Sequence, residues 1–122
     1  MPANNFKVDA ASAPIRLGAM FGAMLADLER AVPAGEIAYR FHLTVARIIG
    51  AMCEQIAAET RLDAVALSGG CFQNRLLLGL VVPLLRDAGL TPLVHRQVPC
   101  NDGGVSLGQA AIANRVQGAA GR

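Results

Sequence analysis

The chain has 122 residues, of which 53% are apolar, and a formal net charge of +2. A chain of this length forms at most one domain, and its apolar side chains are numerous enough for a hydrophobic core. The mild charge gives no argument for nucleic-acid binding, because nucleic-acid binders carry a dense basic patch. No apolar run approaches a membrane span, and residues 1–7 lack the apolar segment of a signal peptide. We therefore expect a cytoplasmic protein without a membrane partner.

The N-terminal half predicts an irregular arm followed by two helices. Residues 1–12 are expected to form the arm. Ser12 and Pro14 suit a helix start, and apolar residues at helical spacing continue that helix to about Arg30. A second and longer apolar stripe predicts a helix over about 36–60.

The C-terminal half alternates predicted strands and helices. Short apolar runs predict strands at 64–67 and 92–96, and helical spacing predicts helices over about 73–88 and 105–116. Two strands joined through a helix run parallel with a right-handed crossover. The order predicts an α/β fold with few parallel strands and about four helices. Two strands are too few for a complete sheet, so we expect a piece of a larger fold or a chain that oligomerises, for example as a homodimer.

Local signals add detail to the last two helices. Pro83 lies inside the helix predicted over about 73–88 and is expected to kink or shorten it. Gly89 is expected to cap the end of the same helix. The last helix is expected to turn Leu107, Ala111 and Ile112 inward.

The first glycine turn, Ser68-Gly69-Gly70, directly follows the first predicted strand. Glycines let a ligand approach the backbone without meeting a Cβ atom. A helix start presents unpaired N–H groups and a partial positive charge, which suits a nucleotide. An ordinary strand-to-helix turn has the same sequence, and no P-loop motif occurs. The amide of Asn74, one helical turn later, either reaches the cleft or bonds locally to the helix backbone.

The second glycine turn contains Asp102, which lies between Asn101 and Gly103-Gly104. Two such turns after successive strands are expected to border one cleft. A carboxylate at the carboxyl end of a strand is well placed for a hard cation or a metal–phosphate group. Asp is equally a favoured helix N-cap, so the spacing alone leaves both roles open for Asp102.

The histidines, serines and cysteines offer little chemistry by themselves. A lone helical histidine such as His42 is more often packed than catalytic, and His95 is expected within the second strand as a structural or exposed residue. Neither Ser68 nor Ser106 has an evident base partner, and no His-x-x-x-His pair occurs. The cysteines fit no zinc pattern and are expected to stay reduced and buried or half-buried: Cys53, Cys71 and Cys100.

Three segments taken together resemble the C-terminal end of the HypF family, the carbamoyltransferases of nickel–iron hydrogenase maturation. They are Phe41-His42, Leu67–Arg75 and Asn101–Gln109. The two glycine motifs, their separation and the Phe-His on the preceding helix all agree, and the resemblance extends over about 8–116. It implies that residues 13–122 form the nucleotide-binding lobe of a Kae1-like domain, a partial actin-like ATPase fold.

The resemblance also implies a reaction and its participants. In that family the full enzyme uses carbamoyl phosphate and ATP, and it passes the carbamoyl group to the C-terminal cysteine of the partner HypE for the cyanide ligands of the hydrogenase iron. ATP and a divalent metal (magnesium, iron or zinc) are the implied cofactors. Asp102 matches the family's metal ligand, and the expected nucleotide contacts are Ser68, Gly69, Gly70, Asn74 and Gly103. The alternatives are a non-catalytic assembly module with the same fold and a threonylcarbamoyl-transferase relative.

The sequence also departs from the family pattern. It lacks the histidine metal motif of the preceding half of the domain, and it lacks the acylphosphatase-like, zinc-finger and YrdC-like portions. Asp102 alone is a poor metal site, because a catalytic metal usually has about three protein ligands. We expect the opposite wall of the cleft to come from the missing half or from a separate chain. Alone, this polypeptide is expected to bind nucleotide weakly and to lack full carbamoyltransferase activity.

Overall fold

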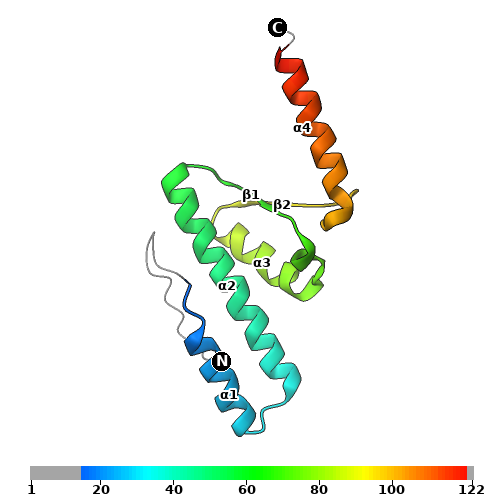
Figure 1. Cartoon of the computed structure of the whole chain (residues 1–122). Coiled ribbons are helices and arrows are strands. Elements are labelled where there is room, and N and C mark those ends of the chain that lie inside the picture. The colour runs from blue at the N-terminus through cyan, green and yellow to red at the C-terminus, as the bar shows by residue number, and fades with distance from the viewer. Residues whose placement is uncertain (1–14, 121–122) are drawn as a thin grey trace.

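The computed structural model describes residues 15–120, and within them four α-helices and two strands follow in the predicted order. Figure 1 shows α1 and α2 as a hairpin, α3 beside α2, the two strands across α3, and α4 standing away from the rest. The predicted arm at 1–12 lies outside the described residues. The elements are α1 Gly18–Glu29, α2 Ala34–Thr60, β1 Ala64–Leu67, α3 Arg75–Asp87, β2 Thr91–Val94 and α4 Val105–Ala120, with the short 3-10 helices η1 Gly70–Gln73 and η2 Asp102–Gly104.

The two strands form a parallel pair, as predicted. Ala64 lies opposite Thr91, and the register continues to Leu67 opposite Val94. The second strand ends at Val94 and does not reach Arg96. His95 therefore lies just beyond the strand, and its predicted place within the strand is wrong, because the chain turns there into the loop that carries the second glycine turn.

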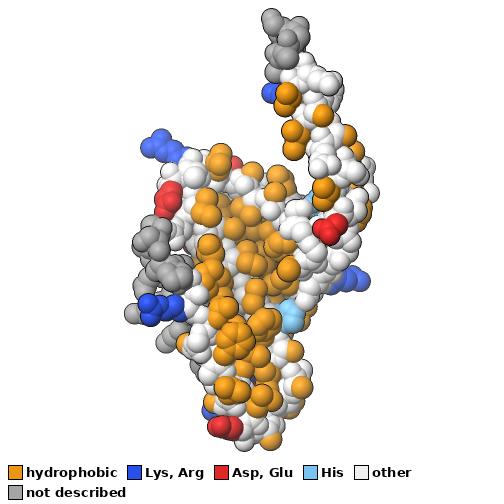
Figure 2. All heavy atoms as spheres, viewed as in Figure 1, with side chains coloured by type: hydrophobic (Ala, Val, Ile, Leu, Met, Phe, Trp, Pro, Cys, Tyr) orange, Lys and Arg blue, Asp and Glu red, His pale blue; other side chains and the backbone are white. Residues whose placement is uncertain are grey.

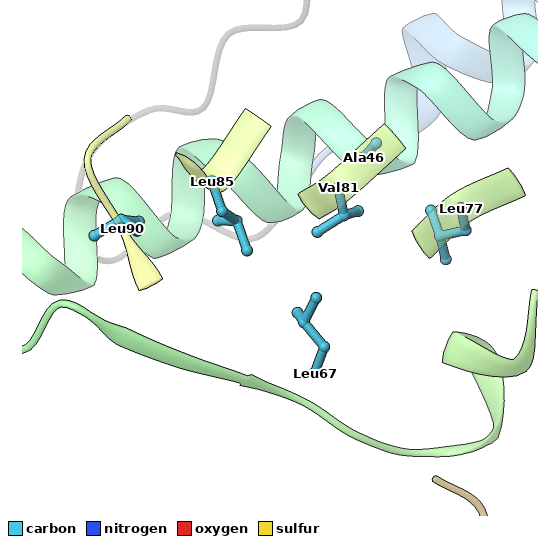
Figure 3. Close-up of a cluster of buried hydrophobic side chains, with 6 residues drawn as sticks. All are labelled: Ala46, Leu67, Leu77, Val81, Leu85 and Leu90. Atoms are coloured by element: carbon cyan, nitrogen blue, oxygen red, sulfur yellow. The ribbon is translucent and has the colours of Figure 1, made fainter. Parts of the chain in front are cut away.

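The core lies between α2, α3 and one face of the strand pair (Figure 3). Val81 and Leu85 of α3 are its largest fully buried side chains. A single helix face can fill this space because apolar residues recur there at helical spacing. The buried cluster consists of Ala46, Leu67, Leu77, Val81, Leu85 and Leu90.

Both ends of α3 are closed by local hydrogen bonds. At its start the Leu77 N–H donates to Oδ1 of Asn74, the N-cap residue. At its end Gly89 has φ +77°, and the Leu90 N–H donates to the Leu85 carbonyl at 2.9 Å, which confirms the predicted glycine cap. Of the two effects predicted for Pro83, a kink or a shortening, the shortening does not occur, because α3 continues through it to Asp87. Burial of Val81 and Leu85 on either side outweighs the one backbone bond that proline removes.

The first and last helices differ from their predicted form. α1 begins at Gly18, whereas Ser12 and Pro14, its predicted start, lie outside the described residues. α4 extends to Ala120, and all its side chains up to residue 118 are exposed. The predicted inward face of Leu107, Ala111 and Ile112 is wrong, since Leu107 is 56% and Ile112 66% exposed. The described part of the chain provides no layer against which α4 packs.

A large apolar surface remains open on this chain. Figure 2 shows apolar side chains gathered in a broad band over the body of the molecule. On α1 the exposed members include Phe21, Leu25 and Leu28. Despite this apolar character, no helix within residues 15–120 combines the length and hydropathy needed to cross a membrane.

An ion cluster joins α1 to α2. Asp27 is only 5% exposed, and its carboxylate accepts hydrogen bonds from Arg30 and Arg40, each at 2.7 Å. Arg40 also donates to Glu36 at 2.6 Å. The Arg40 hydrogen bond is the main reason that the pKa of Asp27 lies below its ordinary value, and burial opposes it. The cluster fixes the hairpin although most of α1 is exposed.

We predict that Leu85→Ala lowers the free energy of unfolding by about 2–5 kcal/mol. The substitution removes a fully buried side chain, and the surrounding core residues cannot move enough to fill the cavity it leaves. Urea unfolding followed by circular dichroism measures the loss. Leu76→Ala on the same helix is the matched control, because Leu76 is 42% exposed, and we expect a much smaller effect. Equal losses in the two variants would contradict this account of the core.

We predict that Asp27→Asn lowers the melting temperature at pH 7, because Asn cannot form the two ion pairs. The folded pKa of Asp27 lies below its ordinary value of 3.8, so the stabilisation is present above that value and is lost as the pH falls through the folded pKa. The melting temperatures of wild type and variant should therefore converge at acidic pH. A difference that persists unchanged under those conditions would show that the carboxylate charge is not its source.

Candidate functional site

A backbone hydrogen bond joins the two glycine turns at the carboxyl ends of the strands. The Gly69 N–H donates to the Cys100 carbonyl at 2.6 Å. The strands end in register at Leu67 and Val94, so both turns leave the same edge of the pair. The structure thus brings the two sequence motifs together in space. Ligand sites of open α/β sheets lie at this kind of edge.

The first turn is built around a glycine conformation. Gly69 has φ +100° and ψ 159°, a region that only glycine occupies readily. A Cβ atom added at Gly69 or Gly70 would have no other atom within 4 Å, so the backbone there borders open space. The helix predicted over about 73–88 does not begin at once after Gly70. The one-turn η1 intervenes, and α3 begins at Arg75 with its N-terminus capped by Asn74.

The second glycine turn packs closely on neighbouring residues of its own loop. Asn101 is the cap of η2, since its Oδ1 accepts from the Gly103 N–H at 3.0 Å. A Cβ atom at Gly104 would lie 2.7 Å from the Pro99 carbonyl oxygen, so the close approach requires glycine. Asp102 is exposed and its side chain makes no hydrogen bond or ion pair with another described residue. The capping role considered for Asp102 therefore belongs to Asn101, and the carboxylate is left for other partners.

The Asn74 side chain forms hydrogen bonds within the protein, including the local bond to the helix backbone that was one of its two predicted roles. Besides capping α3, its Nδ2 lies 2.8 Å from Nε2 of His42 on α2. His42 Nδ1 lies 2.7 Å from the Ala38 carbonyl oxygen. The sequence singled out both residues but did not predict this contact, which spans 32 positions along the chain.

Ser68 has a histidine partner, so the expectation that none exists is wrong. Its Oγ lies 2.9 Å from Nε2 of His95, and both residues are exposed. The strand register explains the pair, because each residue is the first beyond aligned strand ends at Leu67 and Val94. The strand ends predicted from the sequence, at residues 67 and 96, place Ser68 opposite Gln97, so this contact is found only with the observed end of β2 at Val94.

The described residues do not hold a metal by themselves. They contain no group of three or more His, Cys, Asp or Glu side chains arranged to bind an ion. All three cysteines are free, and Cys71 is exposed, contrary to its predicted burial, while Cys53 and Cys100 are half-buried. Burial is the main reason that the pKa of Cys53 is raised, which favours its neutral thiol. A shallow groove of about 370 Å³ lies elsewhere, between α3 and β2, and includes none of the predicted site residues.

We predict that Gly69→Ala destabilises the first turn by about 1–3 kcal/mol, because its backbone region is strained for any side chain. Gly70→Ala is the matched control: its Cβ also meets open space and its φ is not in the left-handed region. Thermal unfolding of the two variants should separate them. Equal stabilities would show that the turn relaxes without cost.

The sequence and the fold of this chain are similar to those of known proteins. The family "Carbamoyltransferase, Kae1-like domain, second subdomain" matches residues 2–109. Carbamoyltransferase HypF of Rhodobacter capsulatus is 37% identical over 92 residues, which is 72% of this chain and 12% of that protein. The Synechocystis carbamoyltransferase HypF is 41% identical over 73 residues, or 60% of this chain and 9% of that protein. The chain thus spans about a tenth of the length of these relatives.

Two solved structures share the fold. A full-length HypF in a phosphate- and nucleotide-bound form is 38% identical, with a TM-score of 0.75 over 79% of this chain and 13% of that one. HypF of T. kodakarensis is 28% identical, with a TM-score of 0.78 over 97% of this chain and 16% of that one. The sequence motifs, the parallel strand pair and these matches agree. This chain therefore belongs to the HypF carbamoyltransferase family and corresponds to the second subdomain of its Kae1-like domain.

Proposed function

We propose that this chain serves as the nucleotide-binding lobe of a HypF-type carbamoyltransferase. In that reaction carbamoyl phosphate and ATP provide the activated carbamoyl group, and the C-terminal cysteine of HypE accepts it for the cyanide ligands of hydrogenase. The observation that carries the proposal is the Gly69–Cys100 hydrogen bond, which joins both glycine motifs at the carboxyl edge of the strands. A 38% identical relative, of whose chain this one matches 13%, has been solved in a phosphate- and nucleotide-bound form, which supports a nucleotide as a ligand of the family.

The residues at this edge suit a nucleotide. Gly69 and Gly70 leave open space beside the backbone, so a ligand approaches without meeting a side chain. Ser68 and Asn74 are exposed and provide a hydroxyl and an amide for ligand oxygens. The Gly103 N–H is already used by Asn101, and a Cβ atom at Gly103 would lie 3.1 Å from Asn101 Oδ1, so Gly103 offers a ligand neither this donor nor open space beside its Cα atom. ATP, when bound, supplies the adenylyl group that activates the carbamate.

A catalytic metal does not fit the described residues alone. Asp102 provides one carboxylate, whereas a catalytic metal usually has about three protein ligands. On this proposal the remaining ligands come from another part of a HypF-type protein or from a separate chain. We therefore assign no step to a metal held by this lobe, and we expect the lobe alone to bind nucleotide weakly and to lack full activity.

An assembly role is the second candidate, and the exposed apolar surface favours it. Phe21, Leu25 and Leu28 on α1 and Ile112 on α4 are each more than half exposed. Phe21, Leu25 and Leu28 recur at helical spacing along α1, and exposed apolar residues gathered in this way mark interaction surfaces. A homodimer or a complex with the other part of the domain would cover them. In this case the chain keeps the HypF-type fold but does not itself take part in carbamoyl transfer.

We predict that the purified chain binds ATP with magnesium weakly but saturably in isothermal titration calorimetry. Asp102→Ala should weaken that binding about tenfold or more, because the carboxylate would contact the magnesium ion of the nucleotide and a charge-assisted contact contributes roughly 1.5–3 kcal/mol. Asp87→Ala is the matched control, since Asp87 is an exposed carboxylate at the far end of α3 and should leave the affinity unchanged.

Two results would contradict the nucleotide-binding proposal. A folded chain that shows no saturable ATP binding favours the assembly module, especially when sedimentation shows a dimer. Binding that is equally strong in wild type and Asp102→Ala would remove Asp102 from the site.

A further inference from the structure

The hydrogen bonds around Asn74 fix which way its amide points. A backbone carbonyl can only accept, so the 2.7 Å contact of His42 Nδ1 with the Ala38 oxygen makes Nδ1 the protonated nitrogen. In the neutral ring Nε2 is then an acceptor, and the Asn74 Nδ2 group at 2.8 Å donates to it. Asn74 Oδ1 accepts from the Leu77 N–H at 3.1 Å. Each contact agrees with the next, so the donor and acceptor ends of the amide are determined.

The reverse orientation would fail at both ends. A flipped amide would direct its Nδ2 protons at the Leu77 N–H and its oxygen at the lone pair of His42 Nε2. Donor would face donor, and acceptor would face acceptor. His42 therefore holds Asn74 from a second helix, in addition to the capping bond within α3.

The His42 side of this contact is held in place by packing. His42 is half-buried on the 27-residue α2, and its ring meets the Phe41 ring edge-on with centroids 5.7 Å apart. α2 packs against α3 through Ala46, which is fully buried one turn further on. The position of the imidazole is thus set by the packing of α2 against α3 in the core.

We infer that His42 is a positioning residue, which orients the Asn74 amide so that one Nδ2 proton stays available to an acceptor oxygen of the bound nucleotide or acyl-adenylate. Two of the four bonding positions of the amide are used inside the protein, one by His42 and one by Leu77. Asn74 is exposed, so the second Nδ2 proton reaches solvent. The ligand part of this inference rests on the proposed function, whereas the orientation of the amide does not.

Two substitutions at position 42 separate its two hydrogen bonds. In His42→Gln the longer side chain can place an oxygen where Nε2 lies and accept from Asn74. In His42→Asn the shorter side chain can still donate to Ala38 but does not reach Asn74. Arg47→Gln is the control, because Arg47 is an exposed residue of the same helix. The probes are nuclear magnetic resonance of the His42 ring nitrogens and the Asn74 side-chain amide, and calorimetric titration with ATP and magnesium.

We expect wild-type His42 to carry its proton on Nδ1. His42→Asn should shift the Asn74 amide resonances and weaken ATP binding roughly 3- to 10-fold, the size of one hydrogen bond, while its unfolding midpoint stays near that of Arg47→Gln. His42→Gln should restore the resonances and bring the affinity within about twofold of wild type. Such a rescue distinguishes positioning from a general structural role.

Other results overturn the inference. Protonation of wild-type His42 on Nε2, or unchanged Asn74 resonances in His42→Asn, would show that the contact does not orient the amide. If the resonances shift as expected but ATP affinity does not change, the ligand role is wrong. If wild type does not bind ATP, the nucleotide proposal fails separately, and the resonances alone then decide whether His42 orients Asn74.

Discussion

The packing of α3 between α2 and the strand pair is the constraint on which the rest of the structure depends. Val81 and Leu85 are fully buried in that layer, and Leu67 meets them from β1. Because α3 is held on both sides, its first turn has a fixed place relative to α2 and to the strand ends. The His42–Asn74 contact follows from this placement, and the Gly69–Cys100 bond follows from the register of the strands on which α3 packs. The polar edge is therefore a product of apolar packing at some distance from it.

The layer is covered on one side only within the described residues. Ala66 and Leu93 pair across the strands and are both exposed, and α4 extends away from the body (Figure 1). Parallel strands are normally covered on both faces, so this half-covered arrangement is typical of part of a larger fold. The match to 13–16% of the length of solved HypF chains agrees with that interpretation. It also explains why a carboxylate such as Asp102 has too few neighbours here to hold a metal.

Sequence periodicity predicted the order of elements and the parallel pairing, because these depend on local spacing and on one chirality rule. Contacts between distant elements were harder to predict. The His95–Ser68 pair was missed because the second strand was extended past its true end at Val94. The inward face expected for α4 was wrong because helical spacing shows which side chains are apolar, not whether a layer lies against them. The motifs identified the family, while the structure showed which side-chain groups at the edge are already used.

The bond between the two turns is made by the main chain, and this has a practical consequence. The Cys100 carbonyl accepts from Gly69, whereas the Cys100 thiol takes no part. Every amino acid carries the same carbonyl, so the thiol at this position can be exchanged without removing the acceptor. Cys53 is half-buried and Cys71 exposed beside the first turn. A chain in which Cys71 is the single remaining cysteine would carry a fluorescent or spin label next to this edge, where the arrival of a second polypeptide could be followed directly.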